Sequence, residues 1–310
     1  GSITPKGRAL RALPVGPRLA GMVLAAAQSP FAKQAALAAL LIEEQGMGGR
    51  NTGLEARLDR LRNEKGHRAD RIRSAAGRLT EQAAAYGGKP QTKLPAEITV
   101  GGLVSLAFPD RIAANVGQAA DGSISFRLAN GRRARLDAAK QLSAGKYIVV
   151  ADLQGTAAAA RILLAASISL AEIRALHGAR IEKKREVRLE RAGGAFRARV
   201  VERLGNLELS AQMVPLEAGD GLEEAIANLI RDEGLFSALP VMQEEPVSGL
   251  LARLAFAHHH LPETFPPVDE ASLLQTVDDW LLPLLAGAKS LSGITARKIR
   301  DGLYLYAGHE

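Results

Sequence analysis

The pattern of the chain changes near residue 95, and this change limits the folds that it can adopt. Before that point, prolines and hydroxyl residues begin segments in which apolar residues recur at helical spacing. These segments are 5–13, 17–28, 29–44 and 54–85. Beyond it, short segments bounded by turn residues are typical of β-strands. These segments are 98–107, 123–129, 132–137, 146–152 and 160–166. The sequence therefore predicts a helical bundle over residues 1–95 and a small OB-like β-barrel over residues 96–166.

Glycines and prolines indicate where these elements end. Gly87-Gly88 and Pro90 predict a linker between the bundle and the barrel, and a break near Gly66 divides the last helical segment in two. Asn130-Gly131 lies between two strand segments. It predicts a hairpin with a type I′ turn, which needs positive φ at both central residues.

Residues 167–310 alternate between strand and helix patterns, and we expect them to form an α+β C-terminal module. A short helix follows Ser169 and ends near His177. The strand segments after it are 186–190, 195–201 and 207–214. The helical segments that follow are 222–233, 247–260 and 271–285. The sequence thus predicts a multidomain α+β protein of three parts, with boundaries near residues 95 and 166.

Composition excludes several classes of function. The 310 residues contain no cysteine, which excludes disulfides, thiolate metal sites and a cysteine nucleophile. The apolar stretches are far shorter than the ~20 residues of a membrane helix, and no secretory signal pattern occurs, so we expect a cytoplasmic protein. Gly1-Ser2 is typical of the scar left by tag removal, which indicates a piece of a longer protein.

Charge is unevenly distributed along the chain. Residues 1–95 carry 16 basic and 7 acidic side chains, whereas only 6 basic side chains face 15 acidic ones after residue 215. A basic front and an acidic end suggest one surface for a polyanion and another that faces away from it. Arginine outnumbers lysine 29 to 11, so compositional drift in a GC-rich genome is an alternative explanation for part of this excess.

No motif for catalysis or cofactor binding occurs in the sequence. It lacks G-x-x-x-x-G-K-[ST], G-x-G-x-x-G, G-x-S-x-G and H-E-x-x-H. The run His258–His260 does not suit a metal, because adjacent residues on a helix point about 100° apart. We therefore expect no catalytic, cofactor or metal site in this chain, and no enzymatic activity from it alone. Trp280 is expected to anchor a helix in the core.

Arginines supply the candidate binding residues. Four lie on one side of the last helical segment, and three more lie on the strands of the predicted hairpin, together with Arg127. These are Arg57, Arg60, Arg71 and Arg78 on the helix and Arg132, Arg133 and Arg135 on the hairpin. Phe126 is available to stack on a base or, equally, to pack in the core. Such arginines would contact phosphates rather than read bases. The basic run Lys183–Arg185 is bracketed by Glu182 and Glu186, so we expect a solvated turn there.

Several segments resemble DEAH-box helicases. Residues 3–8, 13–14 and 17–20 resemble the segment that leads from the winged helix of these helicases into their ratchet helical bundle. Other segments resemble the β-barrel and C-terminal extension of bacterial helicases of the HrpB group. These are LAFPDRIA at 106–113, LANG at 128–131, ARL at 134–136, VVADL at 149–153, and shorter matches at 160–162, 164–166, 203–205, 209–210, 279–281 and 285–287. The resemblance follows the order of the family over nearly the whole chain, although residues 298–310 depart from it.

The resemblance implies that the chain is the C-terminal accessory region of an ATP-dependent, RNA-directed helicase. It implies that the RecA-like motor domains, with their ATP and Mg²⁺, and most of the winged helix lie outside this sequence. It also implies that the bundle and the barrel close over single-stranded nucleic acid that leaves the motor. We therefore expect the candidate arginines to hold the nucleic-acid backbone. The alternative is a protein-interaction scaffold whose acidic part after residue 215 docks a partner or the motor, without binding nucleic acid.

Overall fold

The computed structural model describes residues 3–44, 49, 51–86, 94–119, 121–137, 142, 145–156, 160–190, 195–217, 219–285 and 291–308. The predicted linker at residues 87–90 lies outside them. The chain folds into two compact units, one of Gly1–Glu182 with Glu202–Leu209 and one of Lys183–Val201 with Ser210–Glu310. The predicted division into three parts at residues 95 and 166 stays a prediction. Within the described residues no helix is long and apolar enough to cross a membrane.

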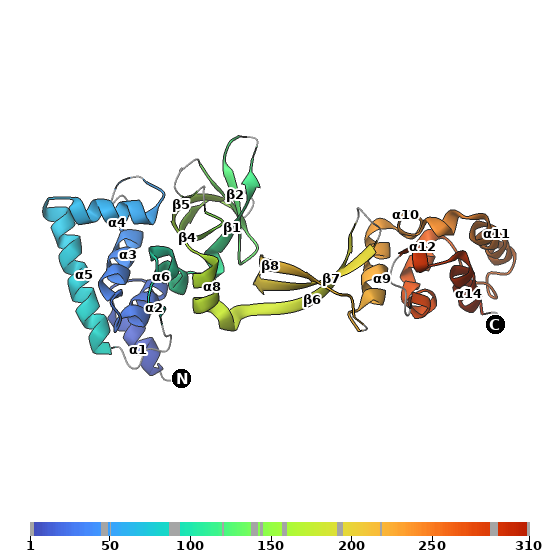
Figure 1. Cartoon of the computed structure of the whole chain (residues 1–310), viewed down its shortest axis with the longest axis horizontal. Coiled ribbons are helices and arrows are strands. Elements are labelled where there is room, and N and C mark those ends of the chain that lie inside the picture. The colour runs from blue at the N-terminus through green and yellow to red at the C-terminus, as the bar shows by residue number, and fades with distance from the viewer. Residues whose placement is uncertain are drawn as a thin grey trace. The chain divides into compact units, whose positions relative to one another are not determined.

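The first unit begins with five helices, as the sequence predicts (Figure 1). These are α1 (Pro5–Ala12), α2 (Pro17–Ala26), α3 (Ala32–Glu43), α4 (Leu54–Asn63) and α5 (His67–Tyr86). Thr4 caps α1 by accepting a hydrogen bond from the Gly7 N–H at 3.1 Å, and Pro17 occupies the first turn of α2. Gly66, with φ of +128°, separates α4 from α5, which confirms the predicted break.

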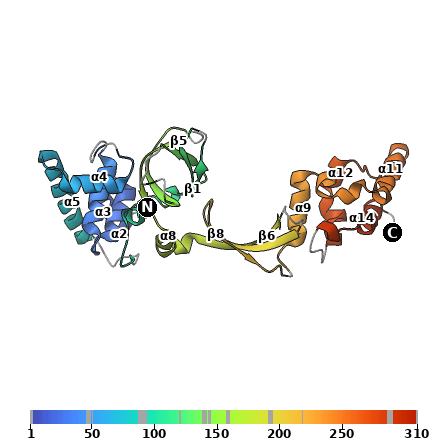
Figure 2. The same cartoon turned by 45° about the horizontal axis from the view of Figure 1, so that its top comes forward.

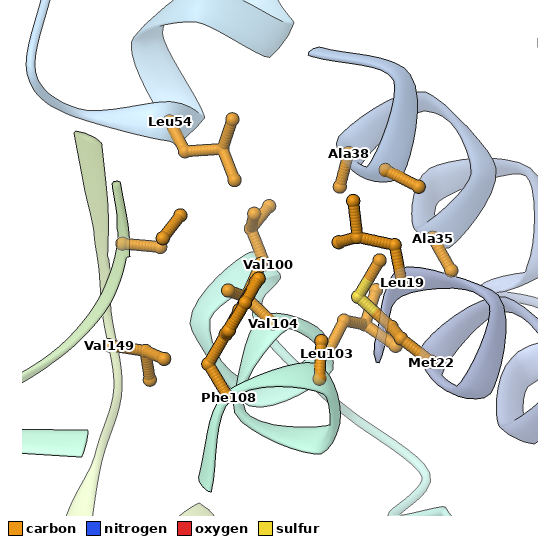
Figure 3. Close-up of a cluster of buried hydrophobic side chains, with 14 of the residues drawn as sticks. Leu19, Met22, Ala35, Ala38, Leu54, Val100, Leu103, Val104, Phe108 and Val149 are labelled. Carbon is orange, nitrogen blue, oxygen red and sulfur yellow. The ribbon is translucent and has the colours of Figure 1, made fainter. Parts of the chain in front are cut away.

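The segment 98–107 is a helix, and the predicted strand there is wrong. Helix α6 (Val100–Ala107) is capped by Thr99, whose hydroxyl accepts a hydrogen bond from the Gly102 N–H at 3.1 Å. Figure 3 shows Leu103 beside Met22 of α2 on one side of α6, and Val149 of β4 (Tyr147–Gln154) on the other. A helix that is buried on every side has an apolar run without period, so periodicity cannot distinguish it from a buried strand.

Five strands close a barrel after α6 and a short 3₁₀ turn, η1 (Pro109–Arg111). They are β1 (Ile112–Gln118), β2 (Ile124–Leu128), β3 (Arg133–Leu136), β4 and β5 (Ala160–Ser167), in the order β1-β2-β3-β5-β4. Strand β4 pairs with β1 to close the barrel, and the pair β3 and β5 is parallel. The sequence predicted five strands, but it missed β1, whose Ala-Ala-Asn-Val-Gly run has low strand propensity.

The hairpin between β2 and β3 forms where Asn130-Gly131 predicted it, but the predicted type I′ turn is wrong. Of the two residues Asn130 and Gly131, only Gly131 has a positive φ, at +87°. Asn130 does not, since every described residue with positive φ is a glycine. Leu128 N–H donates to Arg132 O and Gly131 N–H donates to Leu128 O, both at 2.8 Å. The loop therefore contains three residues and ends with a glycine in the left-handed region, which is the next most common hairpin geometry.

The two faces of β4 and β5 pack in different cores. Phe126, Ile148 and Val150 lie inside the barrel with almost no exposure. Val149, Leu164 and Ala166 face α6 and belong to the core of the bundle. Both faces are thus buried over residues 147–151 and 162–166, which explains why these stretches are continuously apolar rather than alternating.

The chain continues through α8 (Leu170–His177) and η2 (Gly178–Arg180) into a three-stranded sheet of β6 (Ile181–Glu190), β7 (Ala195–Leu204) and β8 (Leu207–Val214), in that order. The basic run Lys183–Arg185 lies within β6, so the predicted turn there is wrong. Arg185 forms an ion pair with Asp220 rather than being simply solvated.

The second unit ends in short helices around their own core. They are α9 (Leu222–Glu233), α10 (Leu235–Ala238), η3 (Pro240–Gln243), α11 (Glu245–His260), α12 (Glu270–Gln275), α13 (Val277–Trp280), η4 (Leu282–Leu285), η5 (Leu291–Gly293) and α14 (Ala296–Tyr306). Trp280 is 2% exposed and donates from Nε1 to Leu273 O at 3.0 Å, which confirms it as a core anchor. The predicted single helix 271–285 is divided at Thr276 and before Pro283, since proline cannot continue the backbone ladder.

One carboxylate joins α6 to α8. Glu172 accepts four hydrogen bonds, from the N–H and hydroxyl of Thr99 at 2.7 Å each and from those of Ser169 at 3.0 and 2.8 Å. Burial raises the pKa of Glu172, but these bonds outweigh burial and leave its pKa below the ordinary value. The same carboxylate thus completes the N-terminal caps of both helices.

Gly101 permits the closest approach between α6 and the barrel. A Cβ at this position would lie 2.0 Å from the backbone oxygen of Ser167. Gly101→Ala should therefore lower the free energy of unfolding by about 3 kcal/mol or more, because backbone has to move. Urea unfolding followed by circular dichroism measures the change.

Gly77→Ala is the matched control. Gly77 lies in α5 with no atom near the position of a Cβ, so alanine there should stabilise the protein by about 0.5–1 kcal/mol. Equal effects of the two substitutions would contradict the proposed close approach.

His177 links α8 to α6 through a buried hydrogen bond. Its Nε2 lies 2.8 Å from Ser105 Oγ, and that hydroxyl donates to Gly102 O at 2.6 Å. The hydroxyl has one hydrogen, so it accepts the Nε2–H of His177. Burial, together with the charge of Arg180, lowers the pKa of His177 to about 4.

This lowered pKa predicts a loss of stability in mild acid. The unfolded chain binds a proton at His177 below its ordinary pKa of 6.5, whereas the folded chain resists until about 4. The neutral His177 therefore contributes its full stabilisation above pH 6.5. As the pH falls to about 4.5, the free energy of unfolding should decrease by about 2–3 kcal/mol. Urea unfolding at both pH values should show this loss in the wild type and a smaller one in His177→Gln. An identical pH dependence in both proteins would exclude the histidine as its source.

Candidate nucleic-acid interface

Alternation along β2 and β3 places three arginines on the outer wall of the barrel. In β3 the exposed Arg133 and Arg135 alternate with the buried Ala134 and Leu136. Arg127 of β2 is exposed and directly opposite Arg133 in the antiparallel register. Two like charges opposite each other on a sheet destabilise it. Neither arginine forms an ion pair with a described residue that would offset their repulsion.

Arg135 has an acidic neighbour. Its Nη1 lies 3.3 Å from Asp121 Oδ2. The pKa of Asp121 is lowered mainly by hydrogen bonds from the hydroxyl and N–H of Ser123, with a further contribution from Arg135. Both side chains remain more than half exposed, so this ion pair contributes little to stability.

The parallel pairing of β3 with β5 adds a fourth arginine, Arg161. It is the register partner of Arg135, it is exposed, and it forms an ion pair with Asp137. Sequence reasoning missed Arg161 as a site residue, because this pairing joins strands that are distant in the chain. The signal in the sequence is its position between Ala160 and Ile162, both of which are buried.

Arg57 extends this set from the barrel to the bundle. Helix α4 is fastened to β5 by the Ala165 N–H, which donates to Thr52 O at 2.9 Å, and by the Ser167 N–H, which donates to Glu55 Oε1 at 2.8 Å. Burial raises the pKa of Glu55 in spite of this bond. Arg57 and Arg161 consequently line one cleft of about 350 Å³ between the helices α3 and α4 and the strands β4 and β5.

The guanidinium of Arg57 is half-buried in this cleft. Its Nε donates to Asn51 O. Burial lowers the pKa of Arg57, and the charge of Asp152 in β4 partly offsets the effect. Asp152 also lines the cleft, yet the two side chains form no direct ion pair.

Arg132 lies at the β2–β3 turn beside Arg133, where its carbonyl oxygen accepts a hydrogen bond from the Leu128 N–H, and its charge acts on Arg111. Arg111 donates to Ala151 O at 3.0 Å, and its pKa is lowered first by burial, with nearby Arg18 and Arg132 also lowering it and Asp110 raising it. Arg18 pairs with Asp110 at 2.8 Å. Arg132 thus adjoins the pair of Arg127 and Arg133 at the turn of the hairpin.

The four helical arginines do not share one face, because α4 and α5 are distinct helices. Arg57 lies at the barrel end of α4, and Arg60 lies against Gly49, where a Cβ would be 2.9 Å from its Nη1. Arg71 and Arg78 are exposed on α5. Both views place α5 on the side of the bundle away from the barrel (Figures 1 and 2).

Phe126 is fully buried inside the barrel. Of the two alternatives for this residue, packing in the core is the one that the structure shows. It therefore cannot stack on a base from this position. Among the described residues no cluster of histidine, aspartate or glutamate side chains could hold a metal ion. His258 instead uses Nδ1 for a 2.7 Å hydrogen bond with Phe265 O.

Comparison with known proteins shows that the chain is similar to part of a helicase, which supports a helicase-related accessory region. No protein-family model matches it. One relative is the ATP-dependent RNA helicase HrpB of Escherichia coli (strain K12), which is 33% identical over 305 residues, 97% of this chain and 35% of the relative. The chain is homologous to this protein, which confirms the predicted resemblance, and it spans about a third of the relative's length.

Two solved structures agree with this homology. They are crystal structures of the E. coli DExH-box NTPase HrpB and of the E. coli DEAH/RHA helicase HrpB. Each matches with a TM-score of 0.54 and 30% identity over 97% of this chain, and the match covers 35% and 36% of those chains respectively. The mixed α+β architecture described above is therefore that of a region of these helicases.

The repulsion between Arg127 and Arg133 is testable in the protein without nucleic acid. Arg133→Gln should raise the free energy of unfolding by about 0.2–1 kcal/mol, with a larger gain at low salt, because one of two opposed charges is removed. Arg135→Gln is the control, since it removes an ion pair with Asp121 and should not stabilise. Urea unfolding at two salt concentrations measures both, and destabilisation by Arg133→Gln would contradict the expected repulsion.

Proposed function

We propose that this chain is the C-terminal accessory region of an ATP-dependent RNA helicase, and that it holds single-stranded nucleic acid by phosphate contacts. The observation that carries the proposal is a continuous row of arginines, from the outer wall of the barrel into the cleft beside α4. The row consists of Arg127, Arg133, Arg135, Arg161 and Arg57. An arginine fork binds phosphate oxygens with two N–H groups, so a row of them suits a nucleic-acid backbone.

Two features support finer assignments within this proposal. The strand order β1-β2-β3-β5-β4, with closure of β4 onto β1, supports an OB-like barrel. The position of the bundle beside this barrel supports a ratchet-type bundle, as the family resemblance implies. On this proposal the boundaries at residues 95 and 166 separate the bundle, the barrel and the C-terminal module.

Motor chemistry is proposed for the parts of the longer protein that this sequence does not contain. RecA-like domains would bind ATP and Mg²⁺ there and move the strand, while this region keeps it engaged. The partners would be single-stranded RNA and the motor domains themselves, in the cytoplasm. We prefer this function to a protein-interaction scaffold, because the homologous proteins are helicases.

Not every arginine contributes equally to this proposal. The row on the barrel wall would provide the main path. Arg132, beside Arg133, and Arg60, against Gly49 of the cleft lining, would extend this path at its two ends. Arg71 and Arg78 would add separate contacts, because they lie on α5. None of these contacts reads a base, so affinity should be independent of sequence along the row and should fall steeply with salt.

Neutralising the row should weaken binding and its salt dependence. A triple variant, Arg127→Gln, Arg133→Gln and Arg161→Gln, should bind a fluorescent 12-nucleotide RNA more weakly than the wild type. The slope of log Kd against log salt should decrease by about 2, since each contact with a single strand contributes about 0.7. Fluorescence anisotropy at several salt concentrations measures both quantities.

A control with the same loss of charge separates this row from general electrostatics. Lys184→Gln, Arg253→Gln and Arg297→Gln remove three exposed cations from the second unit. This variant should retain the affinity and slope of the wild type more closely than the first. If both triple variants bind equally, the barrel wall is not the path, and if neither the wild type nor the control binds RNA at low salt, the scaffold alternative is favoured.

A further inference from the structure

The cleft beside α4 holds a donor and an acceptor that do not satisfy each other. Arg57 uses Nε for the Asn51 carbonyl, and its two terminal nitrogens have no hydrogen-bond partner among the described residues. The half-buried Asp152 carboxylate has no hydrogen-bond or ion-pair partner among the described residues. Its charge nevertheless raises the pKa of Arg57, against the effect of burial. Both groups are therefore open to a ligand that accepts from one and donates to the other.

The size and walls of the cleft suit one small group with an apolar face. Its volume of about 350 Å³ is at the lower end of the range for small-molecule pockets. Apolar side chains of α3 and β5, including Ile42, Leu163 and Leu164, form part of its lining. Arg161 joins the cleft to the arginine row, so a strand that follows the row passes the mouth of the cleft.

We infer that this cleft takes one nucleobase of the bound strand, and that guanine fits its polar groups best. This inference rests on the proposed function. Guanine offers two acceptors, O6 and N7, to a guanidinium and two donors, N1–H and the N2 amino group, on another edge to a carboxylate. Uracil has no amino group to donate to the Asp152 carboxylate. Adenine and cytosine do not combine two neighbouring acceptors for the Arg57 guanidinium with two neighbouring donor groups for that carboxylate. The region would therefore grip the backbone without regard to sequence but prefer a guanine at one position.

Wild-type protein and modified RNA test this inference without any substitution. We compare a 12-nucleotide oligouridylate with versions that carry one central guanine, adenine or cytosine, using fluorescence anisotropy. The Kd of the guanine version should be at least about fivefold lower than the Kd of each of the others. Inosine, which lacks the N2 amino group, and 7-deazaguanine, which lacks N7, should each lose most of this preference.

A pair of variants assigns the preference to the cleft. Asp152→Asn should bring the ratio of the Kd values for the oligouridylate and the guanine version close to one. Asp121→Asn makes the same change of charge on the outer wall, outside the cleft, and should keep the preference. Circular dichroism checks that both variants fold. If Asp152→Asn does not fold, the modified bases still test the inference with wild-type protein.

The outcomes distinguish this inference from the proposed function. Salt-dependent binding of all four oligonucleotides with equal Kd would overturn the base site and leave the backbone contacts standing. A guanine preference that persists in Asp152→Asn, or with both modified bases, would also overturn it. If no oligonucleotide binds at low salt, the proposed function fails and the base site with it.

Discussion

The contact of α6 with the end of β5 is the constraint on which the first unit depends. At Gly101 the helix backbone approaches Ser167 so closely that a Cβ would lie 2.0 Å from its carbonyl oxygen. Glu172 then fixes the same junction by bonding to Thr99 and Ser169 together. The charge of this largely buried carboxylate is compensated by four donors, so loss of the carboxylate would leave all four without this acceptor. A bundle and a barrel are thereby held as a single body with two adjoining cores.

The cleft beside the barrel, which is lined by two arginines and two aspartates, lies next to this junction. While α6 packs against β4 and β5, α4 is fastened to β5 at its N-terminal end, through Thr52 just before the helix and Glu55 in its first turn. The start of α4 thus carries Arg57 to the strand that carries Arg161. The binding surface that we propose is made by packing of apolar residues below it, and its arginines contribute little to the fold. Arg127 and Arg133 even oppose it, which is expected where charge serves a ligand rather than stability.

Local patterns predicted much of the fold, and failed where burial was complete. Pro5, Pro17 and Gly66 begin or end helices where the sequence indicates, and Trp280 is in the core. The segment 98–107 was predicted as a strand, because a helix buried on all sides has no polar face to reveal its period. Strand β1 was missed for the opposite reason, since its pairing with β2 and β4 overrides a weak local preference.

The sequence by itself determined the classes of element, the excess of arginine in the front part and the resemblance to helicases. Only the tertiary structure decided which arginines meet. Arg71 and Arg78 share a helical spacing with Arg57 but lie on another helix, whereas Arg161 is far away in sequence and lies beside Arg135. The physical reason is that charge and periodicity are local properties of a chain. The pairing of β3 with β5 and the seating of α4 are long-range contacts, set by how the apolar faces fit together.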